Sequence, residues 1–278
     1  MGNVDVAVVG LGLAGSAATW AVSRRGHRVA AFEAYGPGHL HGSSHGRARI
    51  FRHAYLDDLY VELAVRAGRL WDRLAAESGE ALLVRTGGVD HGPAREPDRM
   101  AGLLRGHGIP AELLTADEAA RRWPGVRFDG PVAYDPRAGV LDPEATMAAA
   151  TRLAIAAGAH IAYDTPVRAL EPDGTGVRIR TGAGTWHART VVVAAGGWTA
   201  PLLTGLVPLP ALSVTQQQVF FFAPREPGPA WPTLVHDAEG DSDSDAVMMY
   251  GLPEGPLIKI GEHEPGTRTT ADGRDFVV

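Results

Sequence analysis

The first 33 residues constrain the fold of this chain most, because they follow the order strand, glycine loop, helix, strand and acid. Residues 4–9 form a short apolar run of strand length. Gly10, Gly12 and Gly15 follow at the spacing Gly-x-Gly-x-x-Gly. The segment 16–25 is rich in alanine and compatible with a helix that ends at Gly26. A second strand at 28–32 then leads to Glu33.

Each member of this series has a physical role in binding a dinucleotide. Gly10 permits a tight turn, Gly12 lets the backbone approach a pyrophosphate, and Gly15 lets helix and strand pack closely. The free N–H groups of the helix N-terminus then meet the phosphates. A carboxylate at Glu33 can accept a hydrogen bond from an adenosine ribose hydroxyl, which favours NAD or FAD over NADP. The alternative is an ordinary βαβ unit that holds no ligand.

Composition narrows the class of protein. Of the 278 residues, 45% are hydrophobic and 21% are charged, as in soluble globular proteins. An apolar run of about 18 residues, which a membrane span requires, does not occur. The first strand begins almost at once, which leaves no room for a signal peptide, so we expect a cytoplasmic location.

The residue types also exclude several kinds of chemistry. The chain has no cysteine, which rules out disulfides, thiolate metal sites and thiol nucleophiles. We predict no metal site. A net charge of −6 without a basic cluster gives no support for nucleic-acid binding.

Lys259 is the only lysine among the 26 Lys and Arg residues. An amine retained where every other cation is a guanidinium suggests a position that arginine cannot fill. Lys259 lies in a strand-like segment, so its side chain should project from the face opposite Ile258 and Ile260. The alternative is a solitary surface lysine.

Further elements follow from periodicity and end signals. Helices are predicted at 59–77, 97–107, 115–122 and 145–157, the last capped by Asp142. In the first of these, Leu63, Leu70 and Leu74 recur on one side and should be buried. Strands are predicted at 82–89, 159–163, 167–170, 177–180, 185–189 and 191–195 and within 213–223 and 246–262, with an acidic loop at 236–245.

Several motifs beyond the glycine loop occur together in this chain. They are Gly42-Ser43-Ser44-His45-Gly46 followed by Arg49 and Arg52-His53-Ala54-Tyr55, Arg122-Trp123-Pro124-Gly125, Ala195-Gly196-Gly197-Trp198, and Tyr250-Gly251-Leu252-Pro253 with Lys259-Ile260-Gly261-Glu262-His263. Through these motifs the chain resembles the flavin-dependent amine oxidases typified by monomeric sarcosine oxidase and N-methyltryptophan oxidase. The resemblance spans nearly the whole chain.

The resemblance implies an α/β fold. A Rossmann-like FAD-binding domain would carry an inserted α+β substrate domain built on a mixed or antiparallel sheet. We expect the FAD-binding domain at 1–85 and 142–208 and the substrate domain at 86–141 and 209–278. The protein is expected to be a monomer.

The resemblance also implies a reaction, namely oxidation of the C–N bond of an N-methyl amino acid to an imine, with oxygen reduced to hydrogen peroxide. His45 and Arg49 would lie against the flavin, and Arg52 would pair with the substrate carboxylate. Lys259 would promote the reaction with oxygen, and Tyr250 and His263 would line the substrate side. The residues expected to contact FAD are Gly10, Gly12, Leu13, Ala14, Gly15, Glu33, Ala34, Ser43, Ser44, Arg49, Val167, Ala195, Gly196 and Trp198.

Two departures from the family pattern modify these expectations. Where family members carry an acid from a Gly-Glu-Gly segment, this chain has Leu56-Asp57-Asp58, so the accepted amine is not determined. Family members continue beyond the position of Val278, so we expect the chain to lack a C-terminal segment and to have little oxidase activity alone. The alternatives are a related D-amino acid oxidase, glycine oxidase or dehydrogenase, and a non-catalytic nucleotide-binding protein.

Overall fold

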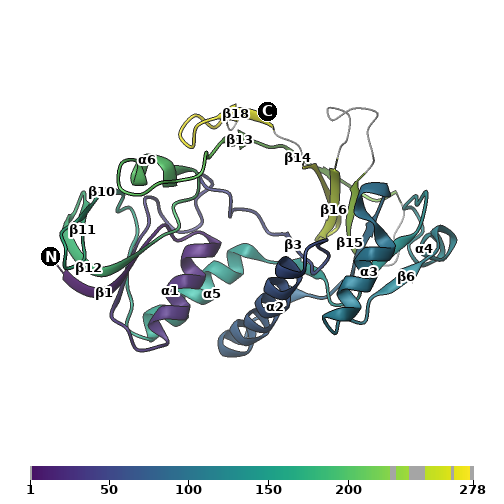
Figure 1. The fold of residues 1–278 in the computed structure, drawn as a ribbon, viewed down its shortest axis with the longest axis horizontal. Coiled ribbons are helices and arrows are strands. Elements are labelled where there is room, and N and C mark those ends of the chain that lie inside the picture. The colour runs from purple at the N-terminus through teal and green to yellow at the C-terminus, as the bar shows by residue number, and fades with distance from the viewer. Residues whose placement is uncertain (1, 226–229, 238–247, 264–265, 276–278) are drawn as a thin grey trace.

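Two large β-sheets dominate the computed structural model, which describes residues 2–225, 230–237, 248–263 and 266–275. The strand order is β10-β11-β12-β1-β2-β9 in one sheet and β14-β17-β16-β15-β5-β7-β6 in the other. The two sheets lie toward opposite ends of the molecule, with the N-terminus in the first (Figure 1). The fold is therefore α/β, as the sequence predicts.

The six-stranded sheet contains the predicted strand–helix–strand unit. Its strands are β1 (Gly2–Val9), β2 (Val29–Phe32), β9 (His160–Ala162), β10 (Val167–Pro172), β11 (Val177–Thr181) and β12 (Gly184–Val193). β1 pairs in parallel with β2 and β12, and β2 pairs in parallel with β9, whereas β10, β11 and β12 are antiparallel neighbours. The separate strands predicted at 185–189 and 191–195 are wrong, because β12 is one continuous strand.

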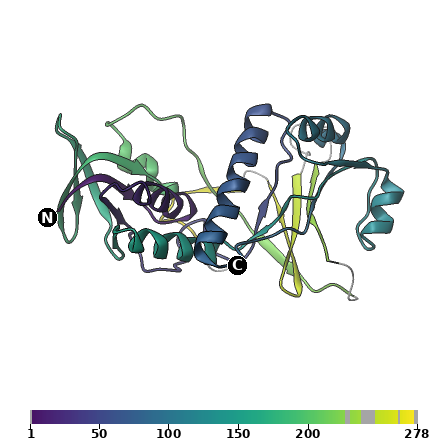
Figure 2. The same ribbon diagram turned by 90° about the horizontal axis from the view of Figure 1, so that it is seen from below.

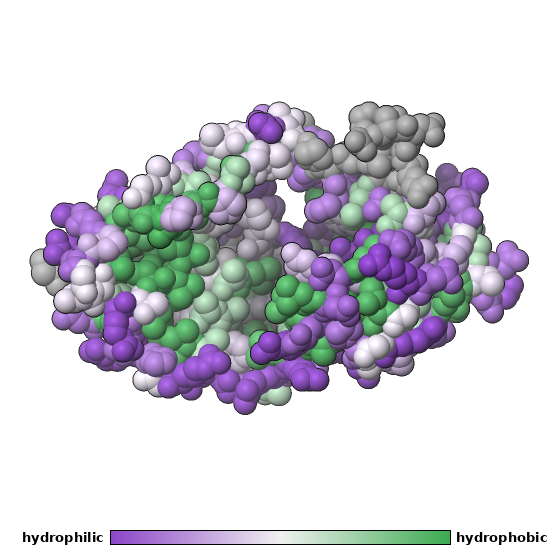
Figure 3. Space-filling view, viewed as in Figure 1, coloured by the Kyte–Doolittle hydropathy of each residue, from purple (hydrophilic) through white to green (hydrophobic). Residues whose placement is uncertain are grey.

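The centre of this sheet is buried on both faces. Val8 and Ala31 pack with Ala154 of α5 (Pro143–Ala156) on one face, while Ala7 and Ala30 pack on the other. Burial on both faces explains why β1 and β2 read as continuous apolar runs rather than as alternating patterns. Apolar residues also gather at the surface between α1 (Leu13–Ser23) and α6 (Thr199–Leu203), as Figure 3 shows.

The seven-stranded sheet is mixed. Its strands are β5 (Gly88–His91), β6 (Glu112–Leu114), β7 (Val132–Asp135), β14 (Val219–Phe222), β15 (Thr233–Asp237), β16 (Met248–Glu254) and β17 (Leu257–Glu262). β15 runs parallel to β5, and the other pairs are antiparallel. The sequence did not predict β15, which contains the first two residues of the predicted acidic loop, and 238–245 lie outside the described residues.

The single strand predicted at 82–89 is wrong. The chain forms β4 (Leu83–Val84) and then turns at Gly87, where φ is +78°, before entering β5. β4 belongs to a three-stranded sheet with β3 (Arg49–Phe51) and β8 (Gly139–Leu141). The remaining described strands are β13 (Val214–Gln216) and β18 (Thr267–Thr269). Short 3₁₀ turns occur at Pro93–Arg95 and Gly196–Trp198.

Helix α2 (Asp58–Ser78) lies between the six-stranded and the seven-stranded sheet (Figure 2). The predicted buried stripe is wrong for Leu63 and Leu70, which are 47% and 52% exposed. Gly68 instead faces the core, where an added Cβ would lie 3.1 Å from the Phe51 ring. Such a close approach needs small residues, so tertiary packing overrides the leucine periodicity. Leu74 is buried as predicted.

The helices predicted at 97–107, 115–122 and 145–157 are confirmed, with bounds that differ by at most two residues. α3 spans Pro97–Gly106, and α4 spans Ala116–Arg122 behind a capping box of Thr115 and Glu118. In α5, the Asp142 carboxylate accepts a hydrogen bond from the Ala145 N–H at 2.9 Å.

The Asp142 cap generates a stability prediction. Asp142→Ala removes the acceptor from the α5 N-terminus and should lower the free energy of unfolding by about 1 kcal/mol. Asp142→Asn keeps a capping oxygen and should change it by only a few tenths of a kcal/mol. Urea unfolding measures both variants, and equal losses would contradict the capping role.

Candidate active site

The glycine loop joins β1, α1 and the end of β12 at very short range. Gly10 has φ of +91°, and an added Cβ there would lie 2.5 Å from the Ala194 carbonyl oxygen. A Cβ on Gly15 would overlap the Gly10 carbonyl oxygen. The Ala194 N–H also donates to the Val9 carbonyl oxygen at 2.8 Å. Side chains at Gly10 and Gly15 would therefore force these elements apart.

The N-terminus of α1 is arranged as an anion site. Gly12 is the extended N-cap residue, without a side-chain cap, and the first turn contains no acid. The Leu13 N–H donates to Ser44 Oγ at 3.1 Å, and an added Cβ on Gly12 would lie 2.9 Å from that oxygen. The predicted loop at 42–46 thus crosses the helix end, where N–H groups and the helix dipole favour phosphate.

Glu33 lies beside the glycine loop and is buried. Its Oε2 accepts a hydrogen bond from the Leu11 N–H at 2.7 Å. Its Oε1 lies 3.3 Å from the Tyr35 nitrogen and 3.4 Å from His39 Nε2. Each carboxylate oxygen has two acceptor positions, so these contacts leave capacity for ribose hydroxyls. The phosphate site and this acid together fit a dinucleotide with an adenosine half.

Other predicted cofactor contacts surround the same region. The Thr165 N–H donates to the Glu33 carbonyl oxygen at 2.8 Å, which brings the start of β10 and Val167 toward Glu33. Trp198 follows β12, and its Nε1 donates to Asp272 Oδ1 at 2.7 Å. Ala14 and Ala34 are exposed, and Ala195 and Gly196 follow the carboxyl end of β12.

Arg49 organises the loop that covers this region. Its guanidinium donates to three backbone carbonyl oxygens, those of Ala48 at 2.8 Å, Ser43 at 2.8 Å and His45 at 2.7 Å. Because a guanidinium has five N–H donors in a fixed fork, one side chain can hold several carbonyls in place. The loop at 43–48 is therefore held around a positive charge.

Lys259 projects from β17 on the face opposite Ile258 and Ile260, as predicted, and is 6% exposed. Its Nζ donates to the Ala48 carbonyl oxygen at 3.3 Å and lies 3.7 Å from Glu254 Oε2. Burial, together with the positive charge of Arg49, lowers the pKa of Lys259. The lysine therefore links the seven-stranded sheet to the loop that Arg49 holds.

The face of the seven-stranded sheet that carries Lys259 is called the lysine face below. Tyr250 lies on this face, since it pairs directly with Gly261, and an added Cβ on Gly261 would lie 2.5 Å from the tyrosine hydroxyl oxygen. Burial raises the pKa of Tyr250, whereas the charge of Arg49 acts against that rise. The His263 imidazole is exposed at the end of β17, and its role stays a prediction.

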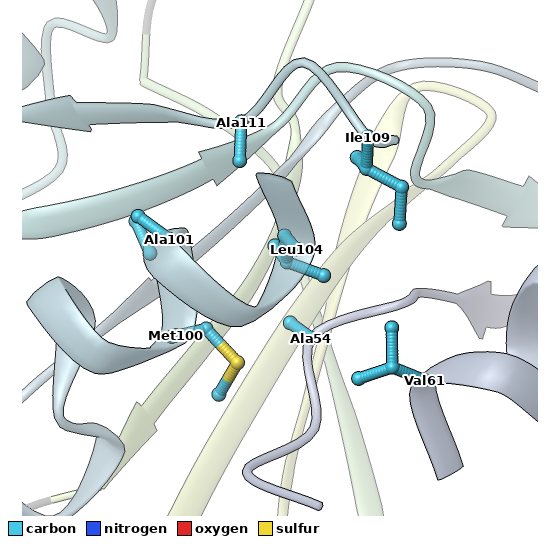
Figure 4. Packing of buried hydrophobic residues seen from close by; sticks show 8 residues of the cluster. Ala54, Val61, Met100, Ala101, Leu104, Ile109 and Ala111 are labelled. Atoms are coloured by element: carbon cyan, nitrogen blue, oxygen red, sulfur yellow. The ribbon is translucent and has the colours of Figure 1, made fainter. Parts of the chain in front are cut away.

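Arg52 lies in the segment that follows β3. Its guanidinium carbon lies 4.9 Å from the centroid of the Tyr55 ring, and its Nη1 lies 3.5 Å from Asp90 Oδ1. Ala54 lies between Arg52 and Tyr55 in the sequence. It packs in a buried cluster with residues of α2 and α3 (Figure 4). This packing fixes the backbone from which the Arg52 side chain extends.

Arg274 is a site residue that the sequence did not reveal. Its Nη1 donates to the carbonyl oxygens of Leu40 at 2.7 Å and Gly42 at 3.0 Å, and its Nη2 lies 2.8 Å from His45 Nε2. A guanidinium cannot accept a hydrogen bond, so His45 Nε2 is the acceptor and the imidazole proton resides on Nδ1. No motif marks Arg274. Because the chain is rich in arginine, one more arginine does not stand out in the sequence.

The neighbours of His45 favour its neutral form. Burial and the charges of Arg274, Arg49 and Lys259 lower the pKa of His45, while Glu144 acts against them. Three cations thus surround a neutral imidazole beside the glycine loop. Preorganised positive charge of this kind stabilises a group that carries or develops negative charge.

Comparison with known proteins accounts for this arrangement. Residues 5–277 match the family described as FAD dependent oxidoreductase (DAO). The chain belongs to this family of FAD-dependent oxidoreductases. Its cofactor is accordingly FAD, and the glycine loop, Glu33 and Ser44 are the residues whose geometry fits it.

Relatives place the chain more narrowly. It is 37% identical to monomeric sarcosine oxidase of Streptomyces avermitilis, over 99% of this chain and 73% of the relative. It is 32% identical to N-methyl-L-tryptophan oxidase of Yersinia pestis, over 95% of this chain and 71% of the relative. The chain is therefore an FAD-dependent oxidoreductase of the sarcosine and N-methyltryptophan oxidase type.

Solved structures agree with this assignment. An open form of a single-residue mutant of NikD, an amino acid oxidase essential for nikkomycin biosynthesis, superposes with a TM-score of 0.87 at 26% identity, covering 100% of this chain and 74% of NikD. Glycine oxidase from Geobacillus kaustophilus gives 0.76 at 26% identity, covering 98% and 75%. Among the described residues, no helix combines the length and apolar character needed to cross a membrane.

The Arg274 contact predicts the protonation state of His45. Nitrogen-15 NMR of the wild-type chain should show the proton on Nδ1 and a pKa below the ordinary 6.5. As the pH falls through that lowered pKa, the ring becomes cationic and the contact with Arg274 is lost. Arg274→Gln removes one positive charge and should raise the pKa of His45. Arg268→Gln, at an exposed position of β18, is the control, and a wild-type His45 protonated on Nε2 would contradict the assignment.

Proposed function

We propose that this protein oxidises the C–N bond of an N-methyl amino acid such as sarcosine, and that oxygen is reduced to hydrogen peroxide. The observation that carries the proposal is that Lys259 and Arg49 both donate to carbonyl oxygens of the loop at 43–48, which contains His45, while Arg52 follows β3 on the far side of that strand. Similarity to sarcosine oxidase and N-methyltryptophan oxidase supports it.

Each of these side chains has a role that its chemistry suits. Arg52 binds the substrate carboxylate, because a guanidinium can donate to both carboxylate oxygens. Tyr250 would line the substrate side, and His45 and Arg49 would lie against the flavin. Bound FAD would supply the redox chemistry, namely transfer of two electrons from the C–N bond to oxygen. The Lys259 ammonium stabilises the negative charge that forms as oxygen is reduced.

The proposed reaction balances with water as the second reactant. The amine loses a hydride from carbon and a proton from nitrogen and becomes an imine. Water hydrolyses the imine, so sarcosine yields glycine and formaldehyde. Oxygen gains two electrons and two protons and becomes hydrogen peroxide. Formaldehyde and peroxide are therefore expected in equal amounts.

The proposal extends to the organisation of the protein. The FAD-binding domain would contain the six-stranded sheet, and the substrate domain would contain the seven-stranded sheet, with the boundaries predicted from the sequence. We further propose that the protein is a monomer that acts in the cytoplasm. Disulfides are rare in that reducing environment, which fits a sequence without cysteine.

A second candidate is oxidation of a primary amine. Its support is the structural likeness to glycine oxidase, at 26% identity. Glycine and sarcosine carry the same carboxylate and differ in one N-methyl group, so they distinguish the two candidates directly. A dehydrogenase that uses another acceptor would reduce the flavin without forming peroxide.

The first test measures cofactor retention and reduction. The purified chain, incubated with FAD and passed through gel filtration, should keep the visible flavin bands. Anaerobic sarcosine should bleach them in a single turnover, although steady-state oxidase activity of this chain alone is expected to be low. Glycine at the same concentration should bleach them much more slowly, because the site is proposed to hold a secondary amine. Retained bands that only glycine bleaches would favour the second candidate, and bands that neither amine bleaches would contradict amine oxidation.

A second test concerns Lys259. Lys259→Met removes the buried ammonium and should slow reoxidation of the reduced flavin by oxygen on the order of 100-fold, the loss typical of one electrostatic stabiliser. Stopped-flow absorbance should show flavin reduction by sarcosine changed far less. Arg178→Met, at an exposed cation of β11, controls for the loss of a positive charge. Unchanged reoxidation in the lysine variant would overturn the proposed role.

A further inference from the structure

Glu254 is an acid of the lysine face to which the proposed function gives no role. It is the last residue of β16, next to the turn that leads into β17. Leu252 pairs directly with Lys259, and Glu254 follows two residues later, so all three side chains lie on the lysine face. Long side chains placed diagonally across two paired strands are close enough to meet. The hairpin of β16 and β17 thus brings an acid to the only lysine of the chain.

The contact between Glu254 and Lys259 is short and sheltered from solvent. Glu254 Oε2 lies 3.7 Å from Lys259 Nζ, and the two side chains are 19% and 8% exposed. Glu254 Oε2 is itself buried and accepts no hydrogen bond. A carboxylate oxygen removed from water is costly unless it is paired, so this oxygen favours a positive charge beside it. Among the described residues, Lys259 is the one cation within 4 Å of the Glu254 carboxylate.

The loop next to Lys259 brings no negative charge to it. Lys259 Nζ donates to the Ala48 carbonyl oxygen at 3.3 Å. The titratable groups of this loop and β3 that interact electrostatically with Lys259 are His45 and Arg49, and both are bases. Glu144 of α5 accepts a hydrogen bond from the loop backbone at 3.0 Å and acts on His45. The loop therefore presents a carbonyl dipole and two bases to the ammonium.

These surroundings have opposing effects on the charge of Lys259. Burial and the charge of Arg49 lower the pKa of Lys259, whereas Glu254 acts against that fall. On the flanking strands, Phe221 of β14 is uncharged and has its ring centroid 5.9 Å from Nζ. Burial raises the pKa of Tyr250 in β16, which keeps its hydroxyl neutral. Among the described residues, Glu254 is therefore the acid that favours a protonated Lys259.

We propose that Glu254 is a positioning residue that holds the Lys259 side chain in place as an ammonium, so that a positive charge is present when oxygen is reduced. This inference rests on the proposed role of Lys259 in the reaction with oxygen. A neutral amine would not stabilise the negative charge that forms there. Glu254 is not a catalytic residue, because it acts on oxygen through Lys259.

The first test uses the single lysine of the chain. Protein labelled with carbon-13 at the lysine Cε gives one lysine resonance, whose chemical shift follows the protonation of Lys259. The pH titration is recorded with and without bound FAD, because the contact with Glu254 is formed by the protein alone. Glu254→Gln keeps the size of the side chain and removes its charge. It should raise the ratio of neutral to protonated Lys259 at a given pH roughly tenfold or more.

Two variants control for other causes. Glu262 lies three residues after Lys259 in β17, so its side chain projects from the opposite face. Glu262→Gln therefore removes an acid from the same strand and should leave the titration of Lys259 unchanged. Glu254→Asp keeps the charge on a shorter side chain and should shift the titration less than Glu254→Gln. Identical titrations of Lys259 in the wild-type chain and Glu254→Gln would overturn the inference.

The second test follows reoxidation of the flavin by oxygen as a function of pH. The FAD-loaded chain is reduced with dithionite, so no amine substrate is needed, and stopped-flow absorbance gives the rate. The rate should fall as the pH rises through the pKa of Lys259, because the ammonium is lost. In Glu254→Gln this fall should begin at a lower pH. At low pH, where Lys259 is protonated in both proteins, the two rates should agree, whereas structural damage would lower the rate at every pH.

The two tests separate this inference from the proposed function. A titration that shifts in Glu254→Gln without a matching shift of the rate profile would leave Glu254 as the partner that keeps Lys259 charged. It would contradict the role of Lys259 in the reaction with oxygen. An unshifted titration would overturn the role of Glu254, whatever the rate profile. A shift of both to lower pH would establish that Glu254 maintains the charge used in the reaction.

Discussion

The contact of β1, α1 and the end of β12 through Gly10 and Gly15 is the constraint on which the rest of the structure depends. Any side chain at these two positions would overlap a carbonyl oxygen of the neighbouring backbone. Because Gly10 and Gly15 have no side chains, the N-terminus of α1 can face Ser44, and Glu33 can lie beside Leu11. The cofactor site is thus a consequence of backbone packing, and the cationic loop is assembled against it.

The positive charges of the site divide into two kinds. Arg49 and Arg274 use their guanidiniums to hold backbone carbonyls of the loop, and Arg95 holds a buried acid. Lys259 and Arg52, whose roles in the reaction are proposed, contact the Ala48 carbonyl oxygen and Asp90 and still have further N–H donors. Carbonyl dipoles stabilise the charges of Arg49 and Arg274, and a carboxylate pairs with Arg95, and these interactions offset part of the cost of bringing several cations together.

Local signals predicted much of this arrangement, and long-range packing explains the failures. The cap of α5 was predicted because Asp142 lies within three positions of the N–H that it caps. The leucine spacing in α2 predicted the wrong buried face, because Gly68 approaches Phe51 of β3 closely. Asp90 and Arg274 were missed because folding brings them to Arg52 and His45 from distant segments, and no spacing rule marks such contacts.

The sequence by itself determined the dinucleotide-binding unit, the family and the unusual status of Lys259, because a glycine requirement, a motif and a lone amine are all visible along the chain. Only the tertiary structure decided which partners each charged side chain meets. Burial and the charge of Arg274, whose guanidinium lies at His45 Nε2, lower the pKa of His45, and the buried Asp90 lies beside the guanidinium of Arg52. Burial and charge balance depend on neighbours that only the folded chain brings together.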